Sequence, residues 1–262
     1  MSEGTLSGRV ALVTGGTSGL GLAIARAFTE RGAHVVVSAR DRARGEEAAS
    51  SLGASFVAGD VSVAGDCKKI VDAAAAEKGR LDILVNNAGV FRAGATVDFD
   101  EETWDMVVST KFKGTFFCTA AALPYMTAQN WGRVINVSAN RKPYPGAATY
   151  SAANAAAGSM TKSWTLEHAG TGITFNDIQP GLIETPATSF LTDNPVLRAS
   201  MVTTIPAGRV GDADEIAAAA AFLASDEAKY IQGAEIVVDG GLLLGWTDSS
   251  PVDAARTSSE AG

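Results

Sequence analysis

The chain alternates short, continuous apolar runs with segments of helical periodicity, and this alternation limits what it can fold into. Residues 9–14 (RVALVT) form an apolar run rich in β-branched residues, and glycines follow it directly. The next apolar residues recur at the spacing of one helix face: Leu20, Ala23, Ile24, Ala27 and Phe28. Continuous apolar strands are buried on both faces, and strands that alternate with helices form parallel sheets. The pattern predicts an α/β fold.

The same unit repeats along the chain. The further expected strands cover residues 34–38, 55–58, 82–85, 133–137, 174–178 and 235–238. The further expected helices cover residues 42–52, 63–77, 101–128, 149–169 and 212–224. About seven strands with right-handed crossovers give a doubly wound parallel sheet in a single domain.

We expect one domain over residues 1–246 and a C-terminal tail over residues 247–262. Residues 182–205 contain proline and threonine and have weak periodicity, so they are predicted to form a mobile lobe over a substrate site. The tail is rich in Ser, Thr, Asp and Ala and is expected to lack fixed structure.

Composition restricts the partners. The net charge of −8 argues against nucleic acid or an anionic membrane as the main partner. No apolar run reaches the roughly 18 residues of a membrane span, and the first nine residues do not resemble a signal peptide. The two cysteines, Cys67 and Cys118, are expected to be buried free thiols. Two scattered histidines do not make a zinc site, so no metal is expected. We therefore expect a cytoplasmic protein whose partner is a small-molecule substrate.

A glycine-rich turn, TGGTSGLG at residues 14–21, stands between the first strand and its helix. Gly15 permits a tight turn, Gly19 lets the backbone approach a pyrophosphate, and Gly21 allows the helix to pack closely on the strand. The helix N-terminus offers N–H groups and a positive dipole end to the phosphates. The predicted dinucleotide contacts here are Gly15, Thr17, Ser18, Gly19, Leu20 and Gly21.

The end of the second strand indicates which dinucleotide binds. Enzymes that use NAD place an acidic side chain there for the ribose 2′-hydroxyl, and those that use NADP place an arginine for the 2′-phosphate. The sequence at residues 37–40 is VSAR, which favours NADP(H) over NAD(H) through Arg40. The alternative is that Arg40 is a solvated charge at a helix start. Asp60 and Val61 close the third strand, where a side chain can reach the adenine.

Several motifs in order resemble the short-chain dehydrogenase/reductase family across residues 6–245. They are TGxxxGxG at the first turn, Asn86-Asn87-Ala88-Gly89, Pro180-Gly181 with Ile183 and Thr185, Gly233, and Asp239-Gly240-Gly241. The resemblance implies a Rossmann-type domain that binds NAD(P), and a homotetramer or homodimer. It adds these cofactor contacts: Asn87, Ala88, Gly89, Asn154, Pro180, Gly181, Ile183 and Thr185.

The resemblance also implies a catalytic set of Asn, Ser, Tyr and Lys, and here the chain departs from the family. Tyr150 matches the tyrosine that exchanges a proton with the substrate oxygen. Four residues later, where the family has its lysine, the chain has Asn154. Lys111 occupies the position of the family asparagine, so the lysine and the asparagine are exchanged. A phenol has an ordinary pKa of about 10, so Tyr150 needs a positive neighbour at neutral pH.

The serine position is altered as well. Ala139 aligns with the family serine, and Ser138 precedes it. The loop that follows is about two residues short, so Ser138 takes the role only if that loop is rearranged; a one-residue displacement on a strand otherwise turns a side chain to the other face. Arg141 and Lys142 lie in this loop, either solvated or as replacement charges.

Three functions remain open. The first is an NADP(H)-dependent oxidoreductase that interconverts a ketone and a secondary alcohol, with Tyr150 as acid/base, Lys111 as the replacement charge and Asn154 on the ribose. The second is an enzyme of the same fold whose Tyr150 catalyses a non-redox cyclisation, isomerisation, elimination or carbon–carbon cleavage. The third is a nucleotide-binding protein without catalysis. The apolar residues of 182–205 favour a hydrophobic substrate.

Overall fold

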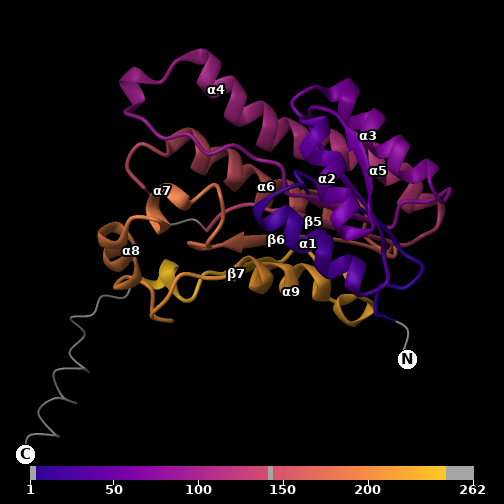
Figure 1. Ribbon diagram of the computed structural model, residues 1–262. Helices are drawn as coiled ribbons and strands as arrows, with labels where there is room; N and C mark the ends of the chain where they lie inside the picture. Colours follow the sequence, from indigo (N-terminus) through magenta and orange to yellow (C-terminus); the bar gives the residue numbers. More distant parts are fainter. Residues whose placement is uncertain (1–3, 141–143, 246–262) are drawn as a thin grey trace, which may run out of the picture.

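The computed structural model describes residues 4–140 and 144–245. Its centre is one sheet of seven parallel strands in the order β3-β2-β1-β4-β5-β6-β7 (Figure 1). The strands are β1 (Val10–Thr14), β2 (His34–Ala39), β3 (Ser55–Ala58), β4 (Ile83–Asn86), β5 (Gly132–Val137), β6 (Ile173–Pro180) and β7 (Glu235–Val238). The predicted doubly wound α/β fold is confirmed.

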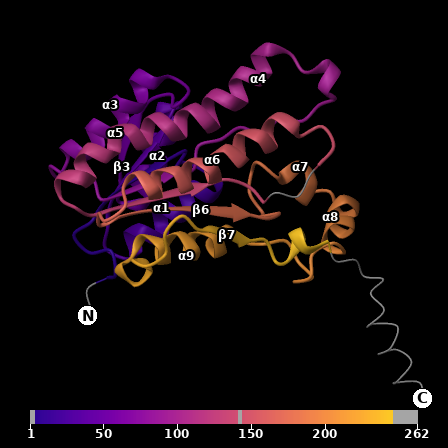
Figure 2. The same cartoon turned by 180° about the vertical axis from the view of Figure 1, so that it is seen from behind.

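Helices cover both faces of this sheet (Figures 1 and 2). The helices are α1 (Gly19–Glu30), α2 (Arg42–Leu52), α3 (Ala64–Ala76), α4 (Glu101–Val108), α5 (Gly114–Ala128), α6 (Ala148–Glu167), α7 (Ser189–Thr192), α8 (Pro195–Val202) and α9 (Ala213–Ala224). One core joins the sheet to α1, α2 and α9, and the other joins it to α3, α5 and α6. Strands β1 to β6 therefore contribute apolar side chains to both cores, which explains the continuous apolar runs, whereas β7 contributes to the first core alone.

The expected single helix over residues 101–128 is a wrong prediction. Helix α4 ends at Val108, a π turn occupies Ser109–Lys113, and α5 begins at Gly114. A π turn bonds each N–H to a carbonyl five residues back, and such turns often mark functional sites. The interruption matters here because Lys111 lies inside it and is buried.

The carboxyl ends of the strands form the edge at which the site lies. The chain leaves β1 toward β2 on one side and returns to β4 on the other, so the strand order reverses between β1 and β4. Ligands of open α/β sheets bind in the crevice at such a reversal. The segment over residues 182–205 carries α7 and α8 and has a small apolar cluster of its own, to which Leu182, Ile205, Val210 and Leu242 contribute.

Two composition-based expectations can be compared with the structure. Cys67 and Cys118 are buried free thiols, as predicted. Within residues 4–140 and 144–245, none of the helices combines the length and the apolar character needed to cross a bilayer. The predicted tail over residues 247–262 lies outside the described residues, and so do Arg141 and Lys142.

Candidate active site

A cavity of about 760 Å³ opens at the carboxyl edge of the sheet. Its walls come from the loop after β4, the start of α6, the end of β6 and the lobe that carries α7. Most of the lining is apolar, including Phe91, Pro145, Leu182, Phe190, Leu191 and Met201. The polar side chains of the described lining are Asn140, Tyr144, Tyr150, Ser151, Asn154 and Thr188. The cavity therefore suits an apolar molecule that meets a few hydrogen-bonding groups at one wall.

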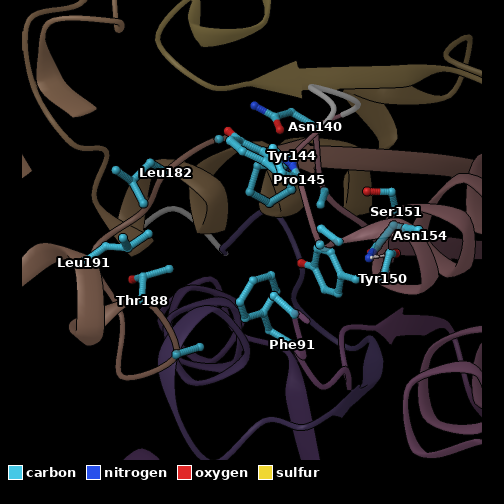
Figure 3. Close-up of a pocket in the computed structure, with 18 of the residues that line it drawn as sticks. Phe91, Asn140, Tyr144, Pro145, Tyr150, Ser151, Asn154, Leu182, Thr188 and Leu191 are labelled. Atoms are coloured by element: carbon cyan, nitrogen blue, oxygen red, sulfur yellow. Dashed lines mark hydrogen bonds between the residues drawn. The ribbon is translucent and has the colours of Figure 1, made fainter. Parts of the chain in front are cut away.

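Tyr150 lies in the first turns of α6 and points its hydroxyl into this cavity (Figure 3). Its ring meets Phe91 edge to face, with the ring centroids 5.0 Å apart. Burial raises the pKa of Tyr150, a hydrogen bond from Asn154 lowers it, and the nearby phenol of Tyr144 raises it again. The net direction is upward, so Tyr150 holds its proton at neutral pH.

Asn154 lies one helical turn beyond Tyr150 and also lines the cavity. Its Nδ2 donates to the Tyr150 carbonyl oxygen at 2.8 Å (Figure 3). Its Oδ1 is buried and has no hydrogen-bond partner within the described structure. A buried acceptor without a partner is unfavourable unless a ligand or water supplies the donor. A sugar hydroxyl would fit this position.

Lys111 is buried behind the cavity rather than in its wall. Only 5% of the residue is exposed, and its ammonium donates to the Val137 carbonyl at the end of β5. A methyl group on Gly89 would lie 3.7 Å from Nζ, so the ammonium is adjacent to the loop after β4. The π turn packs against α6, the helix of Tyr150 and Asn154. Burial lowers the pKa of Lys111 to about 8, and the carboxylate of Asp177 opposes that shift.

Ser138 does not reach the cavity. Its hydroxyl is buried and donates to Asp177 Oδ2 at 2.7 Å, while Ala139 lines the cavity in its place. The strand alternation explains this, because neighbouring residues of a strand face opposite sides. Sequence reasoning missed Asp177. Its signal is a pair of polar residues, Asp177 and Gln179, two positions apart in a strand that is otherwise buried.

The glycine turn has the shape that a dinucleotide requires. Gly15 and Gly19 have φ values of 62° and 51°, in the left-handed region. A Cβ on Gly21 would lie 2.2 Å from the Gly15 carbonyl oxygen. Asn87 Nδ2 donates to the carbonyl oxygens of Thr14 and Gly15 at 3.0 and 3.1 Å, so this amide holds the turn against β4. Ser18 makes no side-chain cap on α1, which leaves the helix N–H groups open to phosphate.

Other predicted cofactor residues surround this turn. A Cβ on Gly19 would meet the Thr185 side chain at 3.5 Å, so the loop after β6 faces the turn. Arg40 Nη1 lies 3.9 Å from Asp60 Oδ2, and 70% of the Arg40 side chain is exposed. The predicted contacts thus gather along the carboxyl ends of β1, β2, β4 and β6, and Asn154, Pro180 and Gly181 also line the cavity.

The chain is similar to several known proteins over nearly its full length. A family model described as enoyl-(acyl carrier protein) reductase matches residues 15–243. The 3-oxoacyl-(acyl-carrier-protein) reductase of Thermotoga maritima is 38% identical over 248 residues, which cover 91% of this chain and 99% of that protein. The 2-(R)-hydroxypropyl-CoM dehydrogenase of Xanthobacter autotrophicus is 36% identical, with 88% and 97% covered.

Solved structures agree with this result. A gluconate 5-dehydrogenase from Burkholderia cenocepacia, in complex with NADP and tartrate, superposes with a TM-score of 0.86 at 31% identity. The match covers 92% of this chain and 97% of that one. Fold, motifs and relatives together show that the chain is an enzyme of the short-chain dehydrogenase/reductase family, a family of oxidoreductases.

Proposed function

We propose that the protein is an NADP(H)-dependent oxidoreductase that interconverts a ketone and a secondary alcohol on a hydrophobic small molecule. One observation carries this proposal: the Tyr150 hydroxyl points into an apolar cavity whose lining includes three predicted cofactor contacts. A substrate oxygen at Tyr150 would therefore lie beside the nicotinamide end of the cofactor. When bound, NADP(H) supplies or accepts the hydride.

Tyr150 acts as the proton donor in the direction of reduction. Its raised pKa keeps the phenol protonated, so it donates a hydrogen bond and then a proton to the carbonyl oxygen. The product of that transfer is a phenolate, and a buried phenolate needs a positive charge nearby. Among the described cavity residues no lysine or arginine is found.

Lys111 provides that charge from behind the wall. A positive charge near a buried phenolate favours the ionised form and lowers the phenol pKa. Asn154 then keeps the ribose contact that the family lysine makes, because its unpartnered Oδ1 accepts from a sugar hydroxyl. In the family a single lysine supplies the charge and binds the ribose. In this chain Lys111 would supply the charge and Asn154 would bind the ribose.

The preference for NADP(H) rests on Arg40. Its exposed guanidinium stands at the end of β2, next to the site where the adenosine ribose would lie, and no acidic residue occupies positions 37–40. An exposed guanidinium at this point pairs well with a 2′-phosphate. Asp60 is its only acidic neighbour within 4.0 Å in the described chain, and that contact is long enough to be displaced.

We also propose that the protein assembles as a homotetramer or homodimer through the outer face of the long helices. Trp104 on α4, Phe112 in the π turn, and Phe116 and Phe117 on α5 are all exposed. The rings of Phe116 and Phe117 are in contact with each other, and exposed apolar patches mark interaction sites. Sedimentation velocity of the purified protein at micromolar concentration would show a single species of two or four chains.

A direct spectrophotometric assay of NADPH tests the activity. We expect NADPH consumption, followed at its absorbance band, in equal amount to the alcohol formed from a panel of alkyl and aryl ketones. Tyr150→Phe should lose at least about 100-fold in kcat, the usual size of an acid–base contribution. Lys111→Met should lose about as much, while the exposed Lys113→Met serves as its matched control. Unchanged turnover by Lys111→Met would refute the role of Lys111.

A second candidate function is favoured by Ala139, which lines the cavity where the family has a serine donor for the substrate oxygen. In this alternative Tyr150 serves as the acid or base of a non-redox cyclisation, isomerisation, elimination or carbon–carbon cleavage. The same assay separates the two functions. Product formation without any change in NADPH absorbance would support the alternative, and stoichiometric NADPH consumption would reject it.

A further inference from the structure

Strand β6 carries two buried polar side chains on the face that packs against α6. Asp177 is 0% exposed and Gln179 is 2% exposed, and both lie on the same face as Phe175, which packs on Trp164 of α6. Asp177 Oδ2 accepts from Ser138 Oγ at 2.7 Å and from Gln179 Nε2 at 3.2 Å. Its second oxygen, Oδ1, is buried and has no hydrogen-bond partner among the described residues. Half of this carboxyl group is therefore uncompensated.

Lys111 has the opposite problem, because its buried ammonium has fewer hydrogen-bond acceptors than donors in the described structure. Its ammonium is buried and has three N–H donors, and one of them is used by the Val137 carbonyl. Val137, whose carbonyl accepts from Lys111, directly precedes Ser138, whose hydroxyl donates to Asp177 at 2.7 Å, so the ammonium and the carboxyl group bind neighbouring residues at the same end of β5. The two groups do not form a direct ion pair within 4.0 Å in the described structure. A buried charge persists only when an opposite charge or hydrogen bonds compensate it. Each group carries the charge that would compensate the other.

We propose that Asp177 is the buried counter-ion that holds Lys111 as an ammonium. This proposal deepens and rests on the proposed function, in which the charge of Lys111 serves Tyr150. Asp177 touches neither the substrate nor the reacting atoms, so it is a positioning residue that acts through Lys111.

The other groups around Asp177 leave this assignment intact. Glu235 on β7 accepts from Gln179 Nε2 at 2.8 Å and raises the pKa of Asp177 by its negative charge. Lys162 on α6 lies 2.6 Å from Glu235 and compensates that charge from the solvent side, with 61% of its side chain exposed. Lys111 is the cation that lowers the pKa of Asp177 within the described structure.

The pair defines a pH window. Burial raises the pKa of Asp177 to about 6 and lowers that of Lys111 to about 8, so carboxylate and ammonium coexist between these values. Below about 6 the counter-ion is protonated, and above about 8 the ammonium is lost. If Lys111 serves Tyr150, kcat/KM should therefore depend on pH as a bell-shaped curve, with an acid limb from Asp177 and a basic limb from Lys111.

The decisive experiment measures Lys111 directly, without substrate or cofactor. The full-length protein is labelled with lysine carrying carbon-13 at Cε and titrated by NMR, and Lys111 is assigned by the signal absent from Lys111→Met. In Asp177→Asn we expect the Lys111 midpoint to fall by at least about one pH unit. At pH 8 the protonated fraction of Lys111 then drops about fivefold, and the basic limb of kcat/KM moves with it.

Glu235→Gln is the matched control, since it removes a carboxylate of the same network without touching Asp177's pairing with Lys111, and its Lys111 midpoint should stay in place. An unchanged midpoint in folded Asp177→Asn overturns the proposal. If Asp177→Asn does not fold, Ser138→Ala replaces it. Loss of the hydroxyl donor raises the pKa of Asp177, and the chemical-shift step that protonation of Asp177 produces in the Lys111 signal should move to higher pH. A Lys111 signal with no such step, or with a step that does not move, overturns the proposal equally.

The two proposals can fail separately. If Lys111→Met retains full turnover while Asp177→Asn shifts the Lys111 midpoint, the counter-ion exists but the catalytic role of Lys111 does not. If Lys111→Met is inactive and the Asp177→Asn midpoint is unchanged, Lys111 serves Tyr150 but its charge is held by other groups.

Discussion

Replacing Lys111 with methionine should change how the stability of the protein depends on pH. The two side chains have similar length, so the variant fills the same space and removes the charge. The folded protein lowers the pKa of Lys111 from 10.5 to about 8. Between those values the unfolded chain holds a proton that the folded chain releases, so the wild-type protein gains stability as pH rises through this window. Below about 8 the full desolvation penalty is present.

The magnitude follows from the two pKa values. The difference between 10.5 and about 8 corresponds to about 3 kcal/mol, which the wild type bears at pH 7 and the variant does not. The variant leaves the Val137 carbonyl without its donor and Asp177 without its counter-ion, and these losses oppose the gain by about 2 kcal/mol together. We expect Lys111→Met to be more stable than the wild type by about 1 kcal/mol at pH 7. By pH 10 the difference should shift by about 2 to 3 kcal/mol in favour of the wild type, so that the variant is then the less stable of the two.

Urea unfolding followed by tryptophan fluorescence at pH 7, 8, 9 and 10 measures this difference. Lys113→Met is the control, because Lys113 is two residues away and exposed, and its difference from the wild type should be independent of pH. A pH-independent difference for Lys111→Met would refute the reasoning, because it would mean that Lys111 carries no desolvation penalty in the folded state.

Three further predictions concern the cofactor site and the sheet. Gly21→Ala places a Cβ 2.2 Å from the Gly15 carbonyl oxygen and should weaken NADPH binding at least about tenfold in a fluorescence titration, whereas Gly65→Ala, with open space around it, should not. Arg40→Ala should raise the Kd for NADPH about tenfold and leave that for NADH nearly unchanged; an equal effect on both would contradict the 2′-phosphate contact. Asp82→Ala removes a fully buried carboxylate that accepts from backbone and arginine donors, and should lower the free energy of unfolding by about 3 to 5 kcal/mol; a loss below about 1 kcal/mol would contradict that role.

The sheet and the cofactor turn could be predicted from the sequence because each leaves a local pattern. A strand buried on both faces has to be a continuous apolar run, as in residues 9–14, and a turn that approaches phosphates has to use glycine. These demands act on neighbouring residues, so the spacing alone reveals them. The order of the strands, by contrast, comes from the structure and not from these local patterns.

The buried polar groups could not be predicted in the same way. The π turn at Ser109–Lys113 differs from an α-helix only in its backbone hydrogen bonds, and no residue type is required for it. Lys111 is followed by Phe112 and then by a second lysine, Lys113, so the sequence alone does not tell that one lysine is buried and the other exposed. Asp177 and Ser138 lie 39 residues apart in sequence, and only the pairing of β5 with β6 brings them together.

The π turn also fixes where the chain can change in length. A π turn holds one residue more than a regular helical turn, and each residue corresponds to about 100° of rotation around the helix axis. Deleting one residue there would let α4 and α5 join into a regular helix and would swing one of them around by that angle. Either α5 would lose its packing on α3, or Lys111 would leave the interior. Insertions and deletions should therefore be tolerated in the exposed loop before α4 and rejected within these five residues.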